Sequence, residues 1–273
     1  MTDNRPIGIF DSGLGGLTVL KEVIEIMPEE NTIYFGDSGR APYGTKSKEV
    51  ITKYTFQDVN FLLSKDVKMI VIGCNTASAC SLDKVKEKVK IPVIDVVEPG
   101  ARAAVGQTKN GRIGVIGTSA TIGSKVYENA IKSLMPEAEI FTKACTLFVP
   151  LAEEGWWSNN IAEMVCEEYL SFFKDKNIDT LILGCTHYPL LKNTIQNAVG
   201  EGVVLVNSAV ELAKVVKNTL GDFDIGCETS NDAKHCYYTS DSVDKFKTLG
   251  GIFLEKEITN AEKVDIDRYE NYY

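Results

Sequence analysis

The sequence has no surplus of positive charge and no long hydrophobic run. Its 29 Lys and Arg side chains are outnumbered by 38 Asp and Glu side chains, which leaves a net charge of −9. A general nucleic-acid binder is therefore excluded, because such proteins need surplus cations to displace counterions from phosphates. No apolar run approaches the roughly 20 residues that cross a bilayer, so we expect no membrane partner. A small anionic ligand stays compatible with this charge, because its site depends on local donors.

Closely spaced cysteine pairs are also missing. The seven cysteines are odd in number and include no C-x-x-C spacing, which fits a reducing compartment better than a secreted disulfide framework. Residues 1–6 are polar and lead directly into an apolar segment, without a charged leader, an apolar signal core or a cleavage site. We therefore expect a cytoplasmic protein.

The composition is that of an ordinary globular protein of about two domains. The 273 residues are 44% hydrophobic and 25% charged, and a typical domain has about 150 residues. Short runs rich in Val and Ile alternate with longer stretches of helical period, which predicts an α/β fold of parallel strands covered by helices. We expect these strands at 7–10, 32–35, 69–72, 92–96, 112–116, 138–141, 180–183 and 203–206.

Three segments of the first half recur in the same order in the second half, about 110 residues later. The matching pairs are 7–12 with 113–118, 70–76 with 181–187, and 92–95 with 204–207. This repeat predicts two similar Rossmann-like α/β domains related by pseudo-twofold symmetry, with the active site in the cleft between them.

The chain after residue 207 is too small to fold comfortably alone, so we expect it to pack back on the first half. The predicted domains are therefore 1–98 plus 208–273, which is discontinuous, and 99–207. Within the tail we expect a helix after residue 208, a polar break at 222–234, and strands at 236–239 and 252–254. His235 is expected at the surface.

Two cysteines occupy equivalent turns of the repeat. Gly-Cys-Asn-Thr at 73–76 and Gly-Cys-Thr-His at 184–187 each follow a buried strand at the start of a helix, where ligands collect in α/β sheets. The N–H groups at such a helix start bind carboxylates and favour a thiolate. A buried, inert thiol is the alternative for either cysteine alone, but the duplicated placement favours function. That structural role remains for Cys80, Cys145, Cys166, Cys227 and Cys236.

A ligand held between the two halves would meet Cys74 and Cys185 from opposite sides. That arrangement removes a proton from one face of a carbon and returns one to the other, so it implies inversion of a stereocentre. Three further loops are weaker signals: 11–18 and 36–44 are rich in glycine, and 150–155 carries acids near a helix start. The first is neither a dinucleotide fingerprint nor a P-loop, because its glycine spacing differs and no Lys-Ser/Thr follows.

Seven segments together resemble the glutamate racemases of the cofactor-independent aspartate/glutamate racemase family. They are 11–18, 34–44, 73–78, 92–99, 114–121, 147–155 and 183–191, and the resemblance covers nearly the whole chain. It implies interconversion of L-glutamate and D-glutamate without a cofactor, with D-glutamate supplied for peptidoglycan synthesis and cell shape. It also implies a homodimer. The chain departs from the family pattern at Thr146, where Pro is usual, at Ala152, where a larger aliphatic residue is usual, and at Asn207, where Asp is common.

The resemblance assigns roles to individual residues. It implies that Cys74 and Cys185 transfer the protons, one serving each enantiomer, with Asp11 assisting near Cys74, and Glu153 and His187 near Cys185. No metal site is implied. The substrate contacts that it carries over are Asp11, Ser12, Pro42, Tyr43, Gly44, Asn75, Thr76, Thr118, Thr121, Thr186 and His187.

The proposed chemistry makes physical demands on these residues. Abstracting the α-proton of an amino acid gives a high-energy carbanion, and the cleft segments contain no lysine that could hold a pyridoxal electron sink. Backbone, Asn and Thr donors must then stabilise the enediolate that forms. We expect one thiolate and one thiol, so that a single encounter both takes and gives a proton. His187 favours a thiolate, whereas Asp11 raises the pKa of a nearby thiol and suits ammonium binding or proton shuttling.

Three alternatives stay open at the level of sequence. An aspartate racemase of the same group would carry similar motifs, because sequence does not measure pocket length. A two-lobed solute-binding or sensor module could bind an anion without turnover, although it has no need of two thiols. A metal hydrolase could use Cys185 and His187 as ligands, but no C-x-x-C or H-x-x-x-H spacing supplies others.

Overall fold

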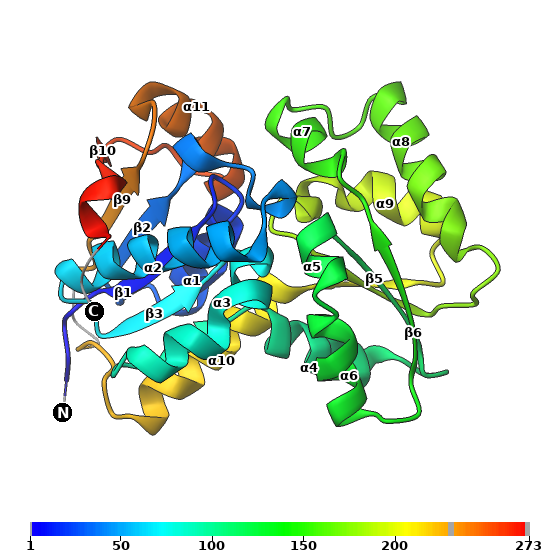
Figure 1. Cartoon of the computed structure of the whole chain (residues 1–273), viewed down its shortest axis with the longest axis horizontal. Coiled ribbons are helices and arrows are strands. Elements are labelled where there is room, and N and C mark those ends of the chain that lie inside the picture. Colours follow the sequence, from blue (N-terminus) through cyan, green and yellow to red (C-terminus); the bar gives the residue numbers. More distant parts are fainter. Residues whose placement is uncertain (1, 229–231, 271–273) are drawn as a thin grey trace.

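Two α/β lobes lie side by side in the computed structural model, which describes residues 2–228 and 232–270 (Figure 1). The first lobe contains a parallel sheet of order β10-β9-β2-β1-β3-β4, and the second a parallel sheet of order β6-β5-β7-β8. The predicted α/β class is confirmed. The strands are β1 (Ile7–Asp11), β2 (Thr32–Gly36), β3 (Met69–Ile72), β4 (Val93–Asp95), β5 (Arg112–Gly117), β6 (Glu139–Ala144), β7 (Thr180–Gly184), β8 (Val204–Asn207), β9 (His235–Thr239) and β10 (Ala261–Lys263).

The strand order of the first lobe repeats in the second. β1 lies between β2 and β3, and β5 lies in the same way between β6 and β7. Ile7 pairs with both Thr32 and Met69, while Ile113 pairs with Ile140 and Thr180. The segments that repeat in the sequence therefore form equivalent strands, and the carboxyl ends of β3 and β7 carry the two Gly-Cys turns.

Helices cover both faces of each sheet, as Figure 1 shows. In the first lobe they are α1 (Leu17–Ile26), α2 (Lys48–Ser64), α3 (Asn75–Lys88), α10 (Ser208–Asp222) and α11 (Val243–Leu254). In the second they are α4 (Val97–Gln107), α5 (Ser119–Gly123), α6 (Val126–Leu134), α7 (Phe148–Glu153), α8 (Asn160–Leu170) and α9 (Lys192–Val199). Among the described residues, no helix is both long and apolar enough to cross a membrane.

Hydrophobic packing joins the lobes on the side where the chain crosses between them. One buried cluster contains Ile9 of β1, Val115 of β5 and Leu212 of α10. Helix α10 packs against both α1 and α4. The opposite faces of the sheets have separate clusters, with Phe10 in the first lobe and Leu183 in the second. Both faces of the central strands are thus buried, as parallel strands require.

We propose that the domains divide as the sequence repeat suggests, into 1–98 plus 208–273 and 99–207. All described strands of the six-stranded sheet lie outside 99–207, and those of the four-stranded sheet lie inside it. The first boundary falls within the first turn of α4, a helix that packs on α6. The second falls at the start of α10, which packs on both lobes.

Two expectations for the tail are wrong. Residues 252–254 (Ile-Phe-Leu) form the end of α11 rather than a strand: Phe253 and Leu254 are buried in the core while Ile252 is exposed, and a short apolar run fits either element. His235 is half-buried on β9 instead of exposed, and its Nδ1 lies 2.9 Å from Thr32 Oγ1. The expected polar break at 222–234 includes 229–231, which lie outside the described residues.

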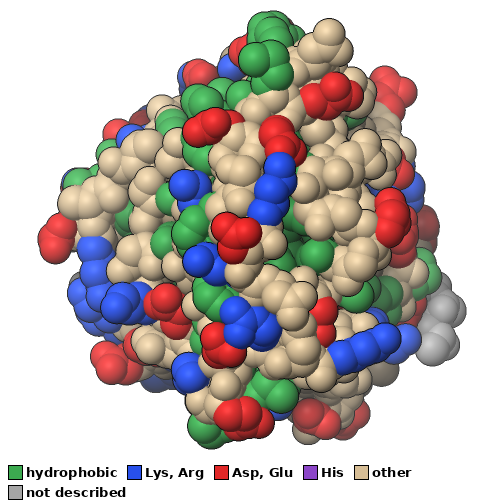
Figure 2. Space-filling view, turned by 90° about the vertical axis from the view of Figure 1, so that its right-hand side faces the viewer, with side chains coloured by type: hydrophobic (Ala, Val, Ile, Leu, Met, Phe, Trp, Pro, Cys, Tyr) green, Lys and Arg blue, Asp and Glu red, His purple; other side chains and the backbone are tan. Residues whose placement is uncertain are grey.

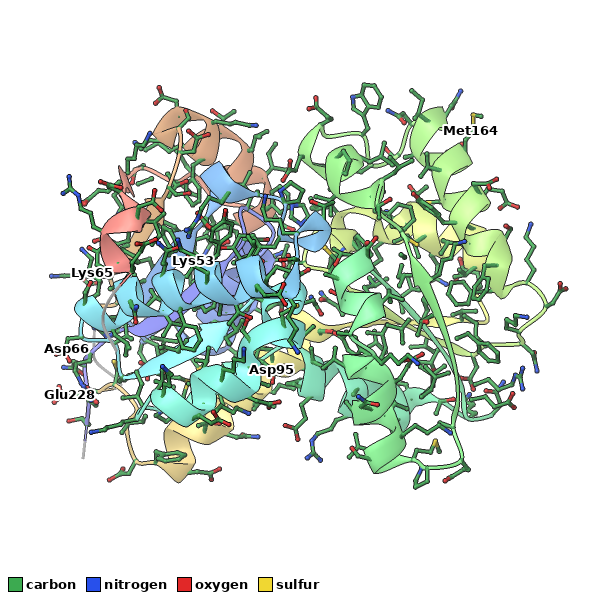
Figure 3. The ribbon with its side chains drawn as sticks, viewed as in Figure 1. Lys53, Lys65, Asp66, Asp95, Met164 and Glu228 are labelled. Atoms are coloured by element: carbon green, nitrogen blue, oxygen red, sulfur yellow. The ribbon has the colours of Figure 1, made fainter. Side chains whose placement is uncertain are left out.

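The outer face of the second lobe carries mixed charge. Figure 2 shows acidic and basic side chains interspersed with apolar ones over this face. Met164 of α8 is 71% exposed there and points away from the lobe in Figure 3.

Candidate active site

Asp11 is the last residue of β1 and lies where the first lobe meets the second. The strand before it is completely buried, and Asp11 itself is 0% exposed. Its Oδ2 accepts a 2.9 Å hydrogen bond from the Gly13 amide, and its Oδ1 accepts one of 3.3 Å from Thr186 Oγ1 of the second lobe. A Cβ at Gly16 would lie 2.5 Å from the Asp11 Cβ, so only glycine lets α1 start this close. Burial raises the pKa of Asp11, although His187 and backbone amides oppose that rise.

Cys74 lies between β3 and α3, where its side chain caps the helix. The Ala77 amide donates to Cys74 Sγ at 3.4 Å, and the thiol lies 3.5 Å from Ser12 Oγ. Burial, and next the negative charge of Asp11, raise the pKa of the Cys74 thiol well above its ordinary value. This environment keeps Cys74 protonated and therefore able to donate a proton.

Cys185 follows β7 in a different electrostatic environment. Its Sγ lies 3.8 Å from His187 Nδ1, and His187 Nε2 lies 3.3 Å from Glu153 Oε1. Burial alone lowers the pKa of His187, but the contacts with Cys185 and Glu153 raise it to about 10. The contact with His187 lowers the pKa of Glu153. The imidazole is therefore a cation at neutral pH, and this cation lies beside the Cys185 sulfur.

A phenylalanine that sequence reasoning missed completes the surroundings of His187. Phe253 of α11 meets the His187 ring edge to face, with ring centroids 5.5 Å apart. It lies in the segment that we expected to form a strand, and an apolar residue in a short apolar run gave no signal of this contact.

The two cysteines line one small cavity between the lobes. Its volume of about 20 Å³ holds about one water molecule and is too small for an amino acid, so the lobes are closed. A cavity of about 310 Å³ adjoins it, shares Gly13, Pro42 and Glu153 with it, and offers a route of entry. The small cavity is lined by Ser12, Gly13, Ala41, Pro42, Tyr43, Gly44, Cys74, Asn75, Thr76, Thr118, Val149, Glu153, Cys185, Thr186 and His187.

All the predicted site residues except two line that cavity. Asp11 lies behind it, bonded to Thr186, and Thr121 lies beside it. Gly13, Ala41 and Val149 also line it. They fall within or beside the loops that were noted from sequence, but small and apolar residues carry no chemical signal of their own.

Hydroxyl groups join the two lobes at the edge of the cavity. Thr118 Oγ1 lies 3.0 Å from both Thr76 Oγ1 and Thr121 Oγ1, and the Thr118 side chain caps α5. A Cβ at Gly44 would lie 2.5 Å from the Thr118 Cβ, so glycine allows this first-lobe loop to contact the second lobe. Three hydroxyls thus converge where an anionic group could bind.

A buried ionic network holds the loop that carries Pro42 and Gly44. The Tyr43 hydroxyl lies between the carboxylates of Asp37 and Asp58, and the Arg40 guanidinium contacts both. Burial, and next the neighbouring Asp37, raise the pKa of Asp58 well above its ordinary value. Sequence reasoning missed Asp58, which lies within α2 and is brought to the loop only by tertiary packing.

Comparison with known proteins agrees with this geometry. The Asp/Glu/Hydantoin racemase family model matches residues 10–216. The glutamate racemase of Geobacter metallireducens is 49% identical over 263 residues, which cover 96% of this chain and 97% of the relative. A glutamate racemase from Francisella tularensis, solved in complex with D-glutamate, superposes with a TM-score of 0.92 at 42% identity and covers 98% of this chain and 100% of that chain.

A second solved structure gives the same result. Glutamate racemase isoform RacE1 from Bacillus anthracis superposes with a TM-score of 0.93 at 39% identity, covering 96% of this chain and 98% of that chain. The resemblance seen in the sequence is thereby confirmed over nearly its full length. The chain belongs to the Asp/Glu/Hydantoin racemase family.

Proposed function

We propose that the protein interconverts L-glutamate and D-glutamate, with Cys74 and Cys185 as bases on opposite faces of the substrate Cα. The observation that carries this proposal is that both thiols line one cavity, from opposite lobes, in different electrostatic surroundings. The similarity to glutamate racemases, one of them solved with D-glutamate, supports the choice of substrate.

The protonation states set the direction of each half-reaction. A Cys185 thiolate beside the His187 cation removes the α-proton from the face turned toward it, and the Cys74 thiol gives its proton to the opposite face. The enzyme then holds a Cys185 thiol and a Cys74 thiolate, which is the state that accepts the other enantiomer. One proton is taken and one is given, so the substrate changes configuration without net loss or gain.

Donors around the cavity stabilise the charge that develops on the substrate. As Cα loses its proton, negative charge moves onto the α-carboxylate. The amide of Asn75 and the N–H groups at the start of α3 lie where they can donate hydrogen bonds to the carboxylate and stabilise that charge. The closed cavity excludes bulk water from the reaction. The hydroxyls of Thr76 and Thr118 suit the side-chain carboxylate.

Asp11 acts from behind the cavity. Its carboxylate does not line the cavity, so transfer of protons to and from Cys74 suits it better than direct binding of the substrate ammonium. The Thr186 hydroxyl of the second lobe donates a hydrogen bond to this carboxylate.

The wider role rests on the family. D-glutamate made in this way supplies peptidoglycan synthesis, and the enzyme works in the cytoplasm as a homodimer. Analytical ultracentrifugation of the purified chain tests the dimer, which a sedimentation coefficient of a 30.0 kDa monomer at all concentrations would contradict.

Polarimetry on D-glutamate in heavy water, with no added cofactor, tests the function. We expect the optical rotation to decay to zero and the new enantiomer to carry deuterium at Cα, while the remaining substrate is unlabelled early in the reaction. Because one methylene in a pocket is worth about 10–200-fold, either aspartate enantiomer should react at least tenfold more slowly. Inversion without deuterium uptake, or faster turnover of aspartate, contradicts the proposal.

We expect the turnover rate to fall as pH rises through about 10. The contacts with Cys185 and Glu153 raise the pKa of His187 to about 10. The His187 imidazole is therefore a cation at neutral pH and loses its charge only when the pH rises through about 10. Without that cation the Cys185 thiolate loses its partner. A pH profile of kcat measures the effect, and Glu153→Gln should move the decline to lower pH. A decline near 6.5 in the unaltered enzyme would show that His187 titrates normally.

A further inference from the structure

Tyr127 lies at the lobe junction, outside the cavity and outside every motif noted from sequence. It is the second residue of α6 and is only 2% exposed. Its hydroxyl donates a 2.6 Å hydrogen bond to Asn75 Oδ1 in the first lobe and lies 3.2 Å from Ser208 Oγ at the start of α10. A fully buried hydroxyl with two polar partners is thus placed between three elements.

The Tyr127 ring lies beside two glycines, whose lack of a side chain leaves room for it. A Cβ at Gly184 would lie 3.2 Å from Tyr127 Cε2, and a Cβ at Gly100 would lie 3.4 Å from Cε1. Gly184 is the residue before Cys185, and Asn75 is the residue after Cys74. One side chain therefore contacts both of the cysteine-bearing turns, through its ring on one side and its hydroxyl on the other.

We propose that Tyr127 is a positioning residue that orients the Asn75 amide toward the substrate carboxylate. An amide has an acceptor end and a donor end. When the Tyr127 hydroxyl donates to Oδ1, the acceptor end is turned toward the second lobe and the Nδ2 donors are left for the cavity that Asn75 lines. The inference rests on the proposed racemase function and deepens it.

The surroundings of the hydroxyl support this direction of donation. Burial raises the pKa of Tyr127 and outweighs the opposing effect of the hydrogen bond with Ser208, so the phenol stays a neutral donor. The Ser208 hydroxyl can donate to the phenol oxygen while the phenol donates to Asn75. The result is a continuous chain of donors from Ser208 through Tyr127 to Asn75 Oδ1.

The hydrogen bonds of Tyr127 with Asn75 and Ser208 lie near the two places where the chain crosses between the lobes. Asp95, labelled at the junction in Figure 3, caps the start of α4 by accepting from the Val97 amide. Asn207 accepts from the Ala209 amide at the equivalent start of α10, next to Ser208. Tyr127 thus joins the two lobes near both crossings, through Asn75 and Ser208.

Tyr127→Phe tests the proposal, because it keeps the ring and removes only the hydroxyl. Loss of one oriented hydrogen bond is expected to lower kcat/KM for glutamate about tenfold, mainly through a lower kcat, because the Asn75 amide stabilises charge that develops as Cα loses its proton. Tyr169→Phe is the matched control: it removes a hydroxyl that lies 3.2 Å from Thr146 Oγ1, away from the cavity, and should stay within about twofold of the unaltered enzyme. Thermal unfolding of each variant shows whether the fold is retained.

A double-mutant cycle separates positioning from general packing. If Tyr127 acts through Asn75, Tyr127→Phe in an Asn75→Ala background should change kcat/KM by less than about twofold. A full tenfold loss in that background, or an unchanged kcat in the single variant, would overturn the proposal. Racemisation by the unaltered enzyme is measured alongside, so failure of the proposed function shows as inactivity of that enzyme and is distinguishable.

Discussion

Replacing either Cys74 or Cys185 by alanine is expected to abolish racemisation in both directions. Each thiol transfers a proton on one face of the substrate Cα and cannot reach the opposite face, because the two thiols line the cavity from different lobes. Positioned proton-transfer groups contribute about 10²–10⁴-fold each, so a loss of at least about 10²-fold in kcat is expected. Polarimetry from each enantiomer gives the rates.

Two buried thiols away from the cavity serve as matched controls. Cys80 lies on α3, the helix that Cys74 caps, and Cys166 lies on α8 of the second lobe. Alanine at either position should leave kcat within about twofold, since neither lines the cavity. Turnover within tenfold of normal in Cys74→Ala or Cys185→Ala would end the two-thiol mechanism.

Hydrogen exchange gives each cysteine variant a second readout. In Cys74→Ala, a Cys185 thiolate can still remove the α-proton on its own face and return a solvent deuteron to that face, whereas Cys185→Ala retains Cys74, which its surroundings keep protonated. Cys74→Ala should therefore exchange the α-hydrogen of one enantiomer without inverting it, and Cys185→Ala should exchange the α-hydrogen of either enantiomer much more slowly. Nuclear magnetic resonance of recovered glutamate in heavy water measures this exchange.

The sheets and the two cysteine turns were predictable because their signals are local. Short apolar strands, each followed by a polar turn, recur in order along the chain, and the duplication marks the pair Cys74 and Cys185. The end of α11 was not predictable, since Ile252, Phe253 and Leu254 fit a strand or a helix equally well. Strand β10 (Ala261–Lys263) is short and pairs at the sheet edge, where no alternation marks it.

The supporting residues of the site were not predictable because tertiary packing creates their roles. Asp58 lies within the long helix α2, and nothing local marks it as the partner of Tyr43 and Arg40. In the sequence, Tyr127 is only an aromatic residue near the start of a helix. Its contact with Asn75 exists only because the two lobes pack together. A single sequence shows which side chains carry reactive groups, whereas the contacts that orient those groups join distant segments.

Asp11→Asn is expected to lower kcat about 10²–10³-fold while changing KM by only a few-fold. The Asp11 carboxylate does not line the cavity, but its negative charge acts on the Cys74 thiol. Loss of this carboxylate should therefore impair proton transfer more than substrate binding. An asparagine retains an oxygen for the Gly13 amide and a group that can bond Thr186, which preserves the local geometry. Steady-state kinetics in both directions separates the two parameters.

Asp95→Asn is the control for Asp11→Asn, because the two carboxylates are matched in burial and in backbone contact. Asp95 is 3% exposed and accepts from the amide two residues on, as Asp11 does. Its counterpart in the second half is already an asparagine, Asn207, which makes the same contact. The control should therefore keep near-normal kcat. If Asp11→Asn instead raises KM and leaves kcat unchanged, then Asp11 binds the substrate ammonium and the proton shuttle must be assigned to another group.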